Sequence, residues 1–393
     1  MIGLFAAVVG AAALVGAVGT RIARDLAIRY GHLDQPEARK VHTAAVPRVG
    51  GAGIVAGATA GLVVLIVGAN DVGLDLPHLD LAAVLLGALA VFVTGFWDDL
   101  YGLGFKRRFV IQAGVAWAMT LAGWHVDLSQ VPFVEHLGPF EQAAISVPLT
   151  VLWTVGLINA MNLLDGLDGL AGGTAVIGFT ALALAFLPTG DAALFVLCAL
   201  GVGGTLGFLV YNRAPATVFM GDGGSTFLGF LLAMAGISGV DAVPSGGLVI
   251  LPAVALGLPL LDTLTQMVRR YLAGLSPFEP DRDHLHHRAF DRSGGVRSAV
   301  AKLHATAATF GALAVTLRLA AGSPLLQGGV LLVAAGVAWA VVRRLGYVRA
   351  RDVARVVGDR LGILRPYSPP TVVIHETRSL EPRSEETAAE SDA

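Results

Sequence analysis

The chain has 393 residues, of which 55% are hydrophobic and only 14% are charged, and its mean hydropathy is +0.70. Soluble domains carry about 25% charged residues, so this composition excludes an ordinary soluble protein and indicates an integral membrane protein. The formal net charge of −2 is uninformative in itself, and we expect no nucleic-acid partner.

A membrane-spanning helix needs about 20 mainly apolar residues. On this basis we predict an all-α, polytopic integral membrane protein with about eleven transmembrane helices. The first apolar segment is interpreted as a retained helix, because its arginines follow it instead of preceding it. The predicted spans are residues 2–20, 49–69, 81–97, 107–124, 142–160, 170–188, 191–211, 224–240, 246–267, 299–318 and 325–344.

The basic residues orient these spans. Lysine and arginine are enriched in cytoplasmic loops, and of the 27 basic residues only Arg318 falls in an even-numbered connection between spans. The odd-numbered connections and the C-terminal segment hold the others. We therefore predict that the N-terminus faces outside and that the C-terminus is cytoplasmic.

Three regions follow from this pattern. Residues 1–345 are predicted to form a transmembrane catalytic domain. Residues 346–376 mix arginines with apolar residues, which is typical of an amphipathic segment on an anionic membrane surface and equally of a solvated helix. Residues 377–393 are rich in Glu, Ser, Thr and Ala, a composition that predicts disorder.

Several polar clusters fall on the predicted cytoplasmic side. The first connection contains Arg39, Lys40 and His42, which suit phosphate oxygens but also fit ordinary positive-inside charge. The third predicted span ends at Asp98 and Asp99, and three cations follow at 106–108. Adjacent carboxylates that are followed by cations suit a metal-phosphate site, because Mg²⁺ is usually bound by one or two carboxylates plus substrate phosphates.

The densest polar cluster is residues 159–170. Asn159, Asn162, Asp165 and Asp168 recur at three-residue spacing between two apolar segments. On a helix they would follow one drifting stripe, but the glycines at 166 and 169 favour a break. Half-buried carboxylates are costly unless a metal or another cation pairs with them.

Two further clusters lie towards the C-terminus. Asp222 is flanked by glycines and followed by Ser225, so backbone amides there can approach an anion. A histidine-rich stretch, 284–288, suits protonatable or hydrogen-bonding contacts with a pyrophosphate better than zinc binding, because no cysteine lies nearby and two of its histidines are adjacent. Asp262 lies inside an apolar span, which makes it a candidate functional residue or the partner of a nearby arginine.

These motifs together resemble those of the polyprenyl-phosphate N-acetylhexosamine-1-phosphate transferases. The resemblance covers about residues 30 to 300. It rests on the ordered motifs Arg39-Lys40-x-His42, Pro47-Arg48-x-Gly50-Gly51, Asp98-Asp99, Asn159-x-x-Asn162-x-x-Asp165-Gly-x-Asp168, Phe219-Met-Gly-Asp222-x-Gly-Ser225 and His284-x-His286-His287-Arg288.

The resemblance implies an enzyme that uses Mg²⁺, or alternatively Mn²⁺, with Asp98 as the family's proposed base. The residues it assigns to catalysis are Asp98, Asp99, Asp222, His284, His286 and His287. Those assigned to substrate binding are Lys40, His42, Lys106, Asn159, Asp165, Asp168, Asn212 and Arg288. Those assigned to the metal are Asn162 and Asp222.

The implied reaction transfers N-acetylglucosamine 1-phosphate from UDP-N-acetylglucosamine to undecaprenyl or decaprenyl phosphate and releases UMP. Leu285 interrupts the three consecutive histidines that are typical of the phospho-N-acetylmuramoyl-pentapeptide transferases, which stay as the alternative branch. An anion transporter is a more distant alternative. The implied setting is a bacterial inner membrane with the site on its cytoplasmic face, in contact with membrane lipids, and a homodimer is one arrangement that the resemblance allows.

Overall fold

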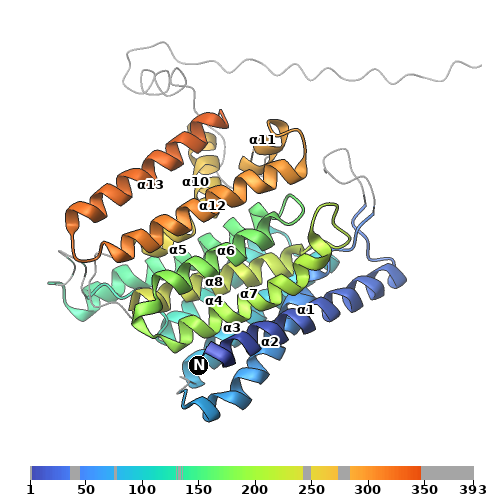
Figure 1. The fold of residues 1–393 in the computed structure, drawn as a ribbon, viewed down its shortest axis with the longest axis horizontal. Coiled ribbons are helices and arrows are strands. Elements are labelled where there is room, and N and C mark those ends of the chain that lie inside the picture. The colour runs from blue at the N-terminus through green and yellow to red at the C-terminus, as the bar shows by residue number, and fades with distance from the viewer. Residues whose placement is uncertain are drawn as a thin grey trace, which may run out of the picture. The chain divides into compact units, whose positions relative to one another are not determined.

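The structure of the chain is a computed structural model that describes residues 2–35, 45–74, 78–129, 131, 134, 136–241, 249–272 and 284–346. These residues belong to one compact unit, Met1–Tyr347. Apart from an isolated antiparallel bridge between Asp34 and Val46, the regular structure in these ranges is helical (Figure 1). The predicted all-α class is therefore confirmed.

Thirteen α-helices and two short 3₁₀ helices make up the described chain. They are α1 (Ile2–Tyr30), α2 (Gly50–Ala69), η1 (Asn70–Val72), α3 (His78–Tyr101), α4 (Phe105–Leu121), α5 (Pro139–Leu164), α6 (Leu170–Ala185), η2 (Leu187–Thr189), α7 (Ala192–Asn212), α8 (Gly221–Asp241), α9 (Leu251–Ala255), α10 (Gly257–Leu272), α11 (Leu285–Asp291), α12 (Val296–Leu319) and α13 (Pro324–Arg344).

Eight of the described helices are long and apolar enough to cross a membrane: α1, α2, α3, α5, α7, α8, α12 and α13. This confirms a polytopic membrane protein. The other predicted spans coincide with shorter helices, since 107–124 overlaps α4 and 170–188 overlaps α6. The predicted span 246–267 overlaps α9 and α10, which are separate helices. The total of eleven spans and their orientation stay predictions.

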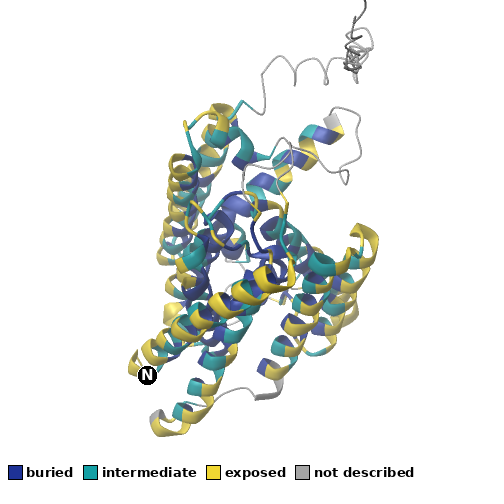
Figure 2. Cartoon of the chain, turned by 90° about the vertical axis from the view of Figure 1, so that its right-hand side faces the viewer, coloured by how far each residue is buried: buried dark blue, intermediate teal, exposed yellow. Residues whose placement is uncertain are grey.

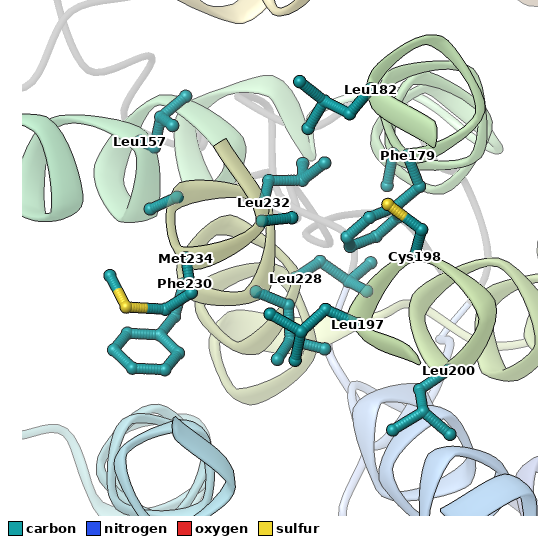
Figure 3. Packing of buried hydrophobic residues seen from close by; sticks show 14 of the residues in the cluster. Leu157, Phe179, Leu182, Leu197, Cys198, Leu200, Leu228, Phe230, Leu232 and Met234 are labelled. Carbon is teal, nitrogen blue, oxygen red and sulfur yellow. The ribbon is translucent and has the colours of Figure 1, made fainter. Parts of the chain in front are cut away.

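Helix α8 forms the centre of the bundle. Its apolar stretch is entirely buried, and it packs against α2, α3, α5, α6 and α7. Figure 3 shows Leu228 and Leu232 of α8 among Leu157 of α5, Phe179 of α6 and Leu197 of α7. A helix that is apolar on all sides is stable only where every side is covered. By contrast, only 17% of the apolar stretch of α1, which begins at the marked N-terminus in Figure 2, and 11% of that of α13 is buried.

Glycines let the backbones of these helices approach closely. A Cβ atom added at Gly229 of α8 would lie 2.7 Å from both Cα of Ile158 and the carbonyl oxygen of Leu157 in α5. A Cβ added at Gly51 of α2 would lie 2.4 Å from the backbone nitrogen of Gly224 in α8. Small residues at such contacts are typical of membrane helix interfaces, where close van der Waals packing replaces the hydrophobic effect.

The polar stretch 159–170 is not one continuous helix. Helix α5 ends at Leu164 and α6 begins at Leu170, and between them Gly169 has the left-handed φ of 78°. The break that the glycines predicted is confirmed. The single helical stripe is wrong, because only Asn159 and Asn162 lie on α5, whereas Asp165 and Asp168 lie in the turn that follows it.

The C-terminal regions predicted as an amphipathic segment (346–376) and a disordered tail (377–393) lie, apart from Gly346, outside the described residues. Both stay predictions.

The close contact between α8 and α5 gives a stability test. We expect Gly229→Ala to destabilise the protein by about 1–3 kcal/mol, because the added methyl group meets the α5 backbone, which cannot move aside as a side chain can. Gly156→Ala on α5 is the matched control, since a Cβ there meets nothing within 4 Å. Thermal unfolding in detergent measures both variants, and equal midpoints for Gly229→Ala and Gly156→Ala would contradict the packing.

Candidate active site

Three of the predicted site residues, Asp98, Asp99 and Asp222, gather with two arginines where several helices end. Asp98 and Asp99 lie near the C-terminal end of α3, Arg108 lies in the first turns of α4, and Asp222 lies in the first turn of α8. Arg48 directly precedes α2. Segments that are distant in sequence therefore contribute to one polar cluster.

Asp222 lies at the centre of this cluster. Its Oδ1 is 3.2 Å from Nη2 of Arg48, and its Oδ2 accepts a hydrogen bond from Nη1 of Arg108. The same Nη1 is 2.8 Å from Oδ2 of Asp98. Two arginines thus bridge the carboxylates, and the side chains of Asp98 and Asp222 each keep 15% of their surface exposed. Clustered carboxylates of this kind need cations, because like charges at close range repel each other.

Asp99 has a different position from its neighbour. Its side chain is 2% exposed, and its two oxygens accept hydrogen bonds from the backbone N–H groups of Asp222 (2.9 Å) and Gly223 (3.0 Å). Asp99 therefore caps the start of α8 from α3, where free N–H groups and the helix dipole favour a carboxylate. Its predicted catalytic role stays a prediction, and the contacts are those of a positioning group.

The segment before α2 is fixed to the segment before α8 by backbone hydrogen bonds. The N–H groups of Gly50 and Gly51 donate to the carbonyls of Phe219 and Met220, at 2.9 and 2.8 Å, and the N–H of Phe219 donates to the carbonyl of Pro47 at 2.8 Å. These bonds hold Arg48 beside Asp222. Burial lowers the pKa of Arg48, whereas the carboxylates of Asp99 and Asp222 raise it. The net effect is a raised pKa, so Arg48 stays charged.

Two members of the cluster were missing from the predicted site. Arg48 belongs to a motif with no assigned role, and of the three cations at 106–108 the resemblance assigns only Lys106 to substrate binding. The structure places Lys106 among the exposed residues of α4, whereas Arg108 makes the carboxylate contacts. Helical geometry decides this, because neighbouring residues of a helix point in different directions; the sequence alone could not tell which of the three cations faces inward.

Asn162 joins the cluster from the last turn of α5. Its Nδ2 donates to Oγ of Ser225 at 3.0 Å, and Oγ of Ser225 donates to the carbonyl of Gly221 at 3.1 Å. This arrangement leaves Oδ1 of Asn162 available as an oxygen ligand for a cation. Asp165 follows in the turn, and burial raises its pKa well above the ordinary value, although the charge of Arg48 opposes the rise.

Three other predicted substrate-binding residues bond to the protein itself. Asn159 donates to Oε1 of Gln112 at 2.8 Å. Asn212, which is 2% exposed, accepts from the N–H of Gly169 and donates to the carbonyl of Val218, both at 2.9 Å. Asp168 accepts from the N–H of Ala216 at 2.9 Å. Asn212 and Asp168 therefore tie the turn after α5 to the chain after α7.

The histidine motif lies against the same turn. A Cβ added at Gly166 would lie 2.2 Å from Nε2 of His286, so only glycine fits beside that ring. His286 is 3% exposed, and burial is the main reason why its pKa falls to about 3. The ring of His287 is 4.3 Å from that of His286. His286 is thus a neutral imidazole, which does not support a cationic contact with a diphosphate.

Arg288 contacts the chain that follows α13. It donates hydrogen bonds to the carbonyls of Leu345 (3.1 Å) and Gly346 (2.7 Å), directly after the last residue of that helix. Lys40 and His42, the remaining predicted residues, lie outside the described residues. Within the described ranges no group of three or more His, Cys, Asp or Glu side chains is arranged to hold a metal ion by itself.

Comparison with known proteins identifies the family. The profile of glycosyl transferase family 4 matches residues 81–240. A probable undecaprenyl-phosphate N-acetylglucosaminyl 1-phosphate transferase of Bacillus subtilis is 37% identical over 299 residues, which cover 76% of this chain and 81% of that protein. The chain therefore belongs to glycosyl transferase family 4.

Two other relatives have related names. The undecaprenyl-phosphate alpha-N-acetylglucosaminyl 1-phosphate transferase of Salmonella typhimurium is 33% identical over 306 residues, covering 75% of this chain and 79% of the relative. The decaprenyl-phosphate N-acetylglucosaminephosphotransferase of Mycobacterium tuberculosis is 33% identical over 308 residues, covering 70% and 73%. The likeness thus extends well beyond the matched family region.

The cap on α8 can be tested by Asp99→Asn. The amide keeps one acceptor oxygen but turns an NH₂ donor towards a backbone N–H group, so we expect a loss of about 1–2 kcal/mol of stability, the typical worth of a helix cap. Asp71→Asn, at an exposed position in η1, is the control for the charge change. A thermal unfolding midpoint of Asp99→Asn that equals that of Asp71→Asn would show that the cap contributes nothing.

Proposed function

We propose that this protein transfers N-acetylglucosamine 1-phosphate from UDP-N-acetylglucosamine to a polyprenyl phosphate and releases UMP. The observation that carries the proposal is the polar cluster of Asp98, Asp222, Arg48 and Arg108 at the ends of membrane helices. The names of the Bacillus, Salmonella and Mycobacterium relatives support the substrate classes.

We also propose the topology with about eleven spans, an outside N-terminus and a site on the cytoplasmic face of a bacterial inner membrane. The cluster joins residues of the first, third and seventh predicted connections, and Asn162 and Asp165 add the fifth. The contact between His286 and Gly166 adds the ninth. Two predicted spans separate each odd-numbered connection from the next, so a chain that crosses the membrane with every span returns each of these connections to the same face, which supports this topology.

The location suits the two substrates. The phosphate head group of a polyprenyl phosphate stays at the membrane surface, and a UDP-sugar arrives from water. Charged side chains at helix ends can meet both groups without entering the hydrocarbon core, where a charge is costly. A transporter would instead place its ionisable residues near the middle of the bilayer.

The residues present fit a divalent cation. Asn162 and Asp222 would hold Mg²⁺, because both offer oxygen ligands and Nδ2 of Asn162 is turned towards Ser225, which leaves Oδ1 for a cation. Asp98 is a further carboxylate near these ligands, since it shares Arg108 with Asp222. When bound, the ion would supply charge neutralisation at the phosphate oxygens.

The chain itself contributes positioning and charge. The reaction breaks one phosphoanhydride and forms another, since an oxygen of the lipid phosphate attacks the β-phosphorus and UMP departs. Arg48 and Arg108 provide guanidinium groups that suit phosphate oxygens. Fixed charges of this kind stabilise the transition state of phosphoryl transfer without covalent chemistry by the protein.

A direct assay tests the proposal. Purified protein in detergent is expected to release UMP when given UDP-N-acetylglucosamine, Mg²⁺ and undecaprenyl phosphate, and Asp222→Asn is expected to lose at least about 100-fold in rate. Asp71→Asn is the active control. Replacing the donor with UDP-N-acetylmuramoyl-pentapeptide tests the alternative branch. If no UDP-sugar yields UMP, the enzymatic proposal is wrong.

The role of Asp98 has its own test. The second pKa of a phosphate monoester is near 6, so the attacking group is already ionised at pH 7 and needs little help from a base. We propose that Asp98 acts mainly by holding Arg108. Asp98→Asn is then expected to lose about 10- to 100-fold in rate by a factor that stays constant between about pH 6.5 and 9. Activity that returns steeply as the pH rises past the phosphate pKa would establish Asp98 as a base instead.

A further inference from the structure

A fully buried carboxylate lies beside the histidine motif and has no role in the reaction so far. Asp262, in the middle of α10, has 0% of its side chain exposed. Its Oδ1 accepts a hydrogen bond from the N–H of Leu285 at 2.7 Å, at the start of α11. Among the described residues its Oδ2 has no hydrogen-bond partner, and a buried carboxylate oxygen without a partner is costly.

Two imidazole nitrogens face that unpaired oxygen. Nδ1 of His284 is 3.6 Å and Nδ1 of His286 is 4.0 Å from Oδ2 of Asp262. Both Nδ1 atoms are buried and also lack a hydrogen-bond partner within the described part of the chain. The two rings are stacked, with centroids 5.6 Å apart and planes inclined by 12°. Three unsatisfied polar atoms therefore converge on one point inside the protein.

The chemistry of the three atoms decides how they pair. The carboxylate only accepts, whereas a neutral imidazole carries one proton, which lies on either Nδ1 or Nε2. The hydrogen bond that one ring nitrogen makes selects the tautomer of the ring. A proton on each Nδ1 gives both rings a donor that points towards the carboxylate oxygen. A small shift of the side chains would shorten the two Nδ1–Oδ2 separations to hydrogen-bond length, or a water molecule would bridge them.

We propose that Asp262 is a positioning residue that holds His284 and His286 as Nδ1–H tautomers, which leaves Nε2 of each ring as a hydrogen-bond acceptor on the side away from α10. The depressed pKa of His286 agrees with a neutral ring at that position. Metal binding by these side chains is the less favoured account, because no group of His, Cys, Asp or Glu in the described part of the chain is arranged to hold a metal ion.

The tautomer defines what the histidines can bind. The assignment of a ligand to them rests on the proposed function. An unprotonated Nε2 accepts a hydrogen bond from an O–H or N–H group and repels a phosphate oxygen. His284, whose side chain is 12% exposed, is the more accessible ring. It therefore suits a hydroxyl or the acetamido N–H of the donor sugar, and not the diphosphate. His286 packs against Gly166 and supports the turn that carries Asp165.

Asp262→Asn isolates this effect. The amide keeps an oxygen for the N–H of Leu285, so the start of α11 is preserved. Its NH₂ group, however, donates towards the Nδ1 atoms and therefore favours the opposite tautomer of whichever ring it meets. Asp262→Ala removes both contacts and serves as the comparison for a purely structural role. Asp71→Asn remains the control for loss of one negative charge.

The readout is ¹⁵N NMR of protein labelled at histidine, with His284→Gln and His286→Gln used to assign the two signals. We expect protonated Nδ1 and unprotonated Nε2 for both rings in the wild type, and a change to protonated Nε2 for at least one ring in Asp262→Asn. In the UMP assay, we expect Asp262→Asn to lose about 10- to 100-fold in kcat/KM for the UDP-sugar, the range typical of residues that orient a functional imidazole, with an unfolding midpoint close to that of Asp71→Asn.

Several results would overturn the proposal. Wild-type rings that are protonated on Nε2, that are cationic at pH 7, or whose Nδ1 atoms bind a co-purified metal would each contradict it, and this measurement needs no variant to fold. Tautomers that are unchanged in Asp262→Asn would do the same. Because NMR does not depend on turnover, absence of UMP release by the wild type would refute the proposed function and leave the tautomer assignment intact.

Discussion

The start of α8 is the point on which the rest of the site depends. Its first N–H groups have no partners within the helix, and the carboxylate of Asp99 supplies them from α3. Glycines 51 and 95 let α2 and α3 approach the same turn, because a Cβ at either position would lie within 2.6 Å of the α8 backbone. This fixed turn places Asp222 where Arg48 and Arg108 reach both of its oxygens. The cap joins α3 to α8, and together with the contacts of the two arginines it brings charged residues from four segments into a single cluster.

Neighbouring polar residues in the site have different roles: some face other charged side chains, and others bond to the backbone or to another helix. Asp98 and Asp99 are neighbours, yet Asp98 faces the arginines and Asp99 faces backbone N–H groups. Asn162 points to the start of α8, whereas Asn159, one turn earlier, bonds to Gln112 of α4. Asn212 and Asp168 fix the turn in which Asp165 lies. A polar motif in a membrane protein therefore contains residues that hold the backbone as well as residues that face a ligand, because buried backbone groups there have little water to bond with.

The histidine motif illustrates why a motif does not define its own chemistry. Three nearby histidines suggest cationic contacts with phosphate, but burial lowers the pKa of His286 to about 3. The group that faces its Nδ1 is the carboxylate of Asp262, which lies more than 20 residues earlier in the chain. The aspartate is conspicuous in the sequence as an ionisable residue in an apolar segment. Its partners are not, since they come from a different helix.

The sequence by itself determined the membrane class, most of the spans, and the break after α5. These features depend on composition and local backbone preference: apolar runs of sufficient length must be helical in a bilayer, and glycines at 166 and 169 weaken a helix. Only the tertiary structure decided that Arg108, and not Lys106, contacts the carboxylates, that Asp99 caps α8, and that Asp262 faces two imidazoles. Those features depend on which side of a helix meets another helix, and that is set by packing between segments far apart in the sequence.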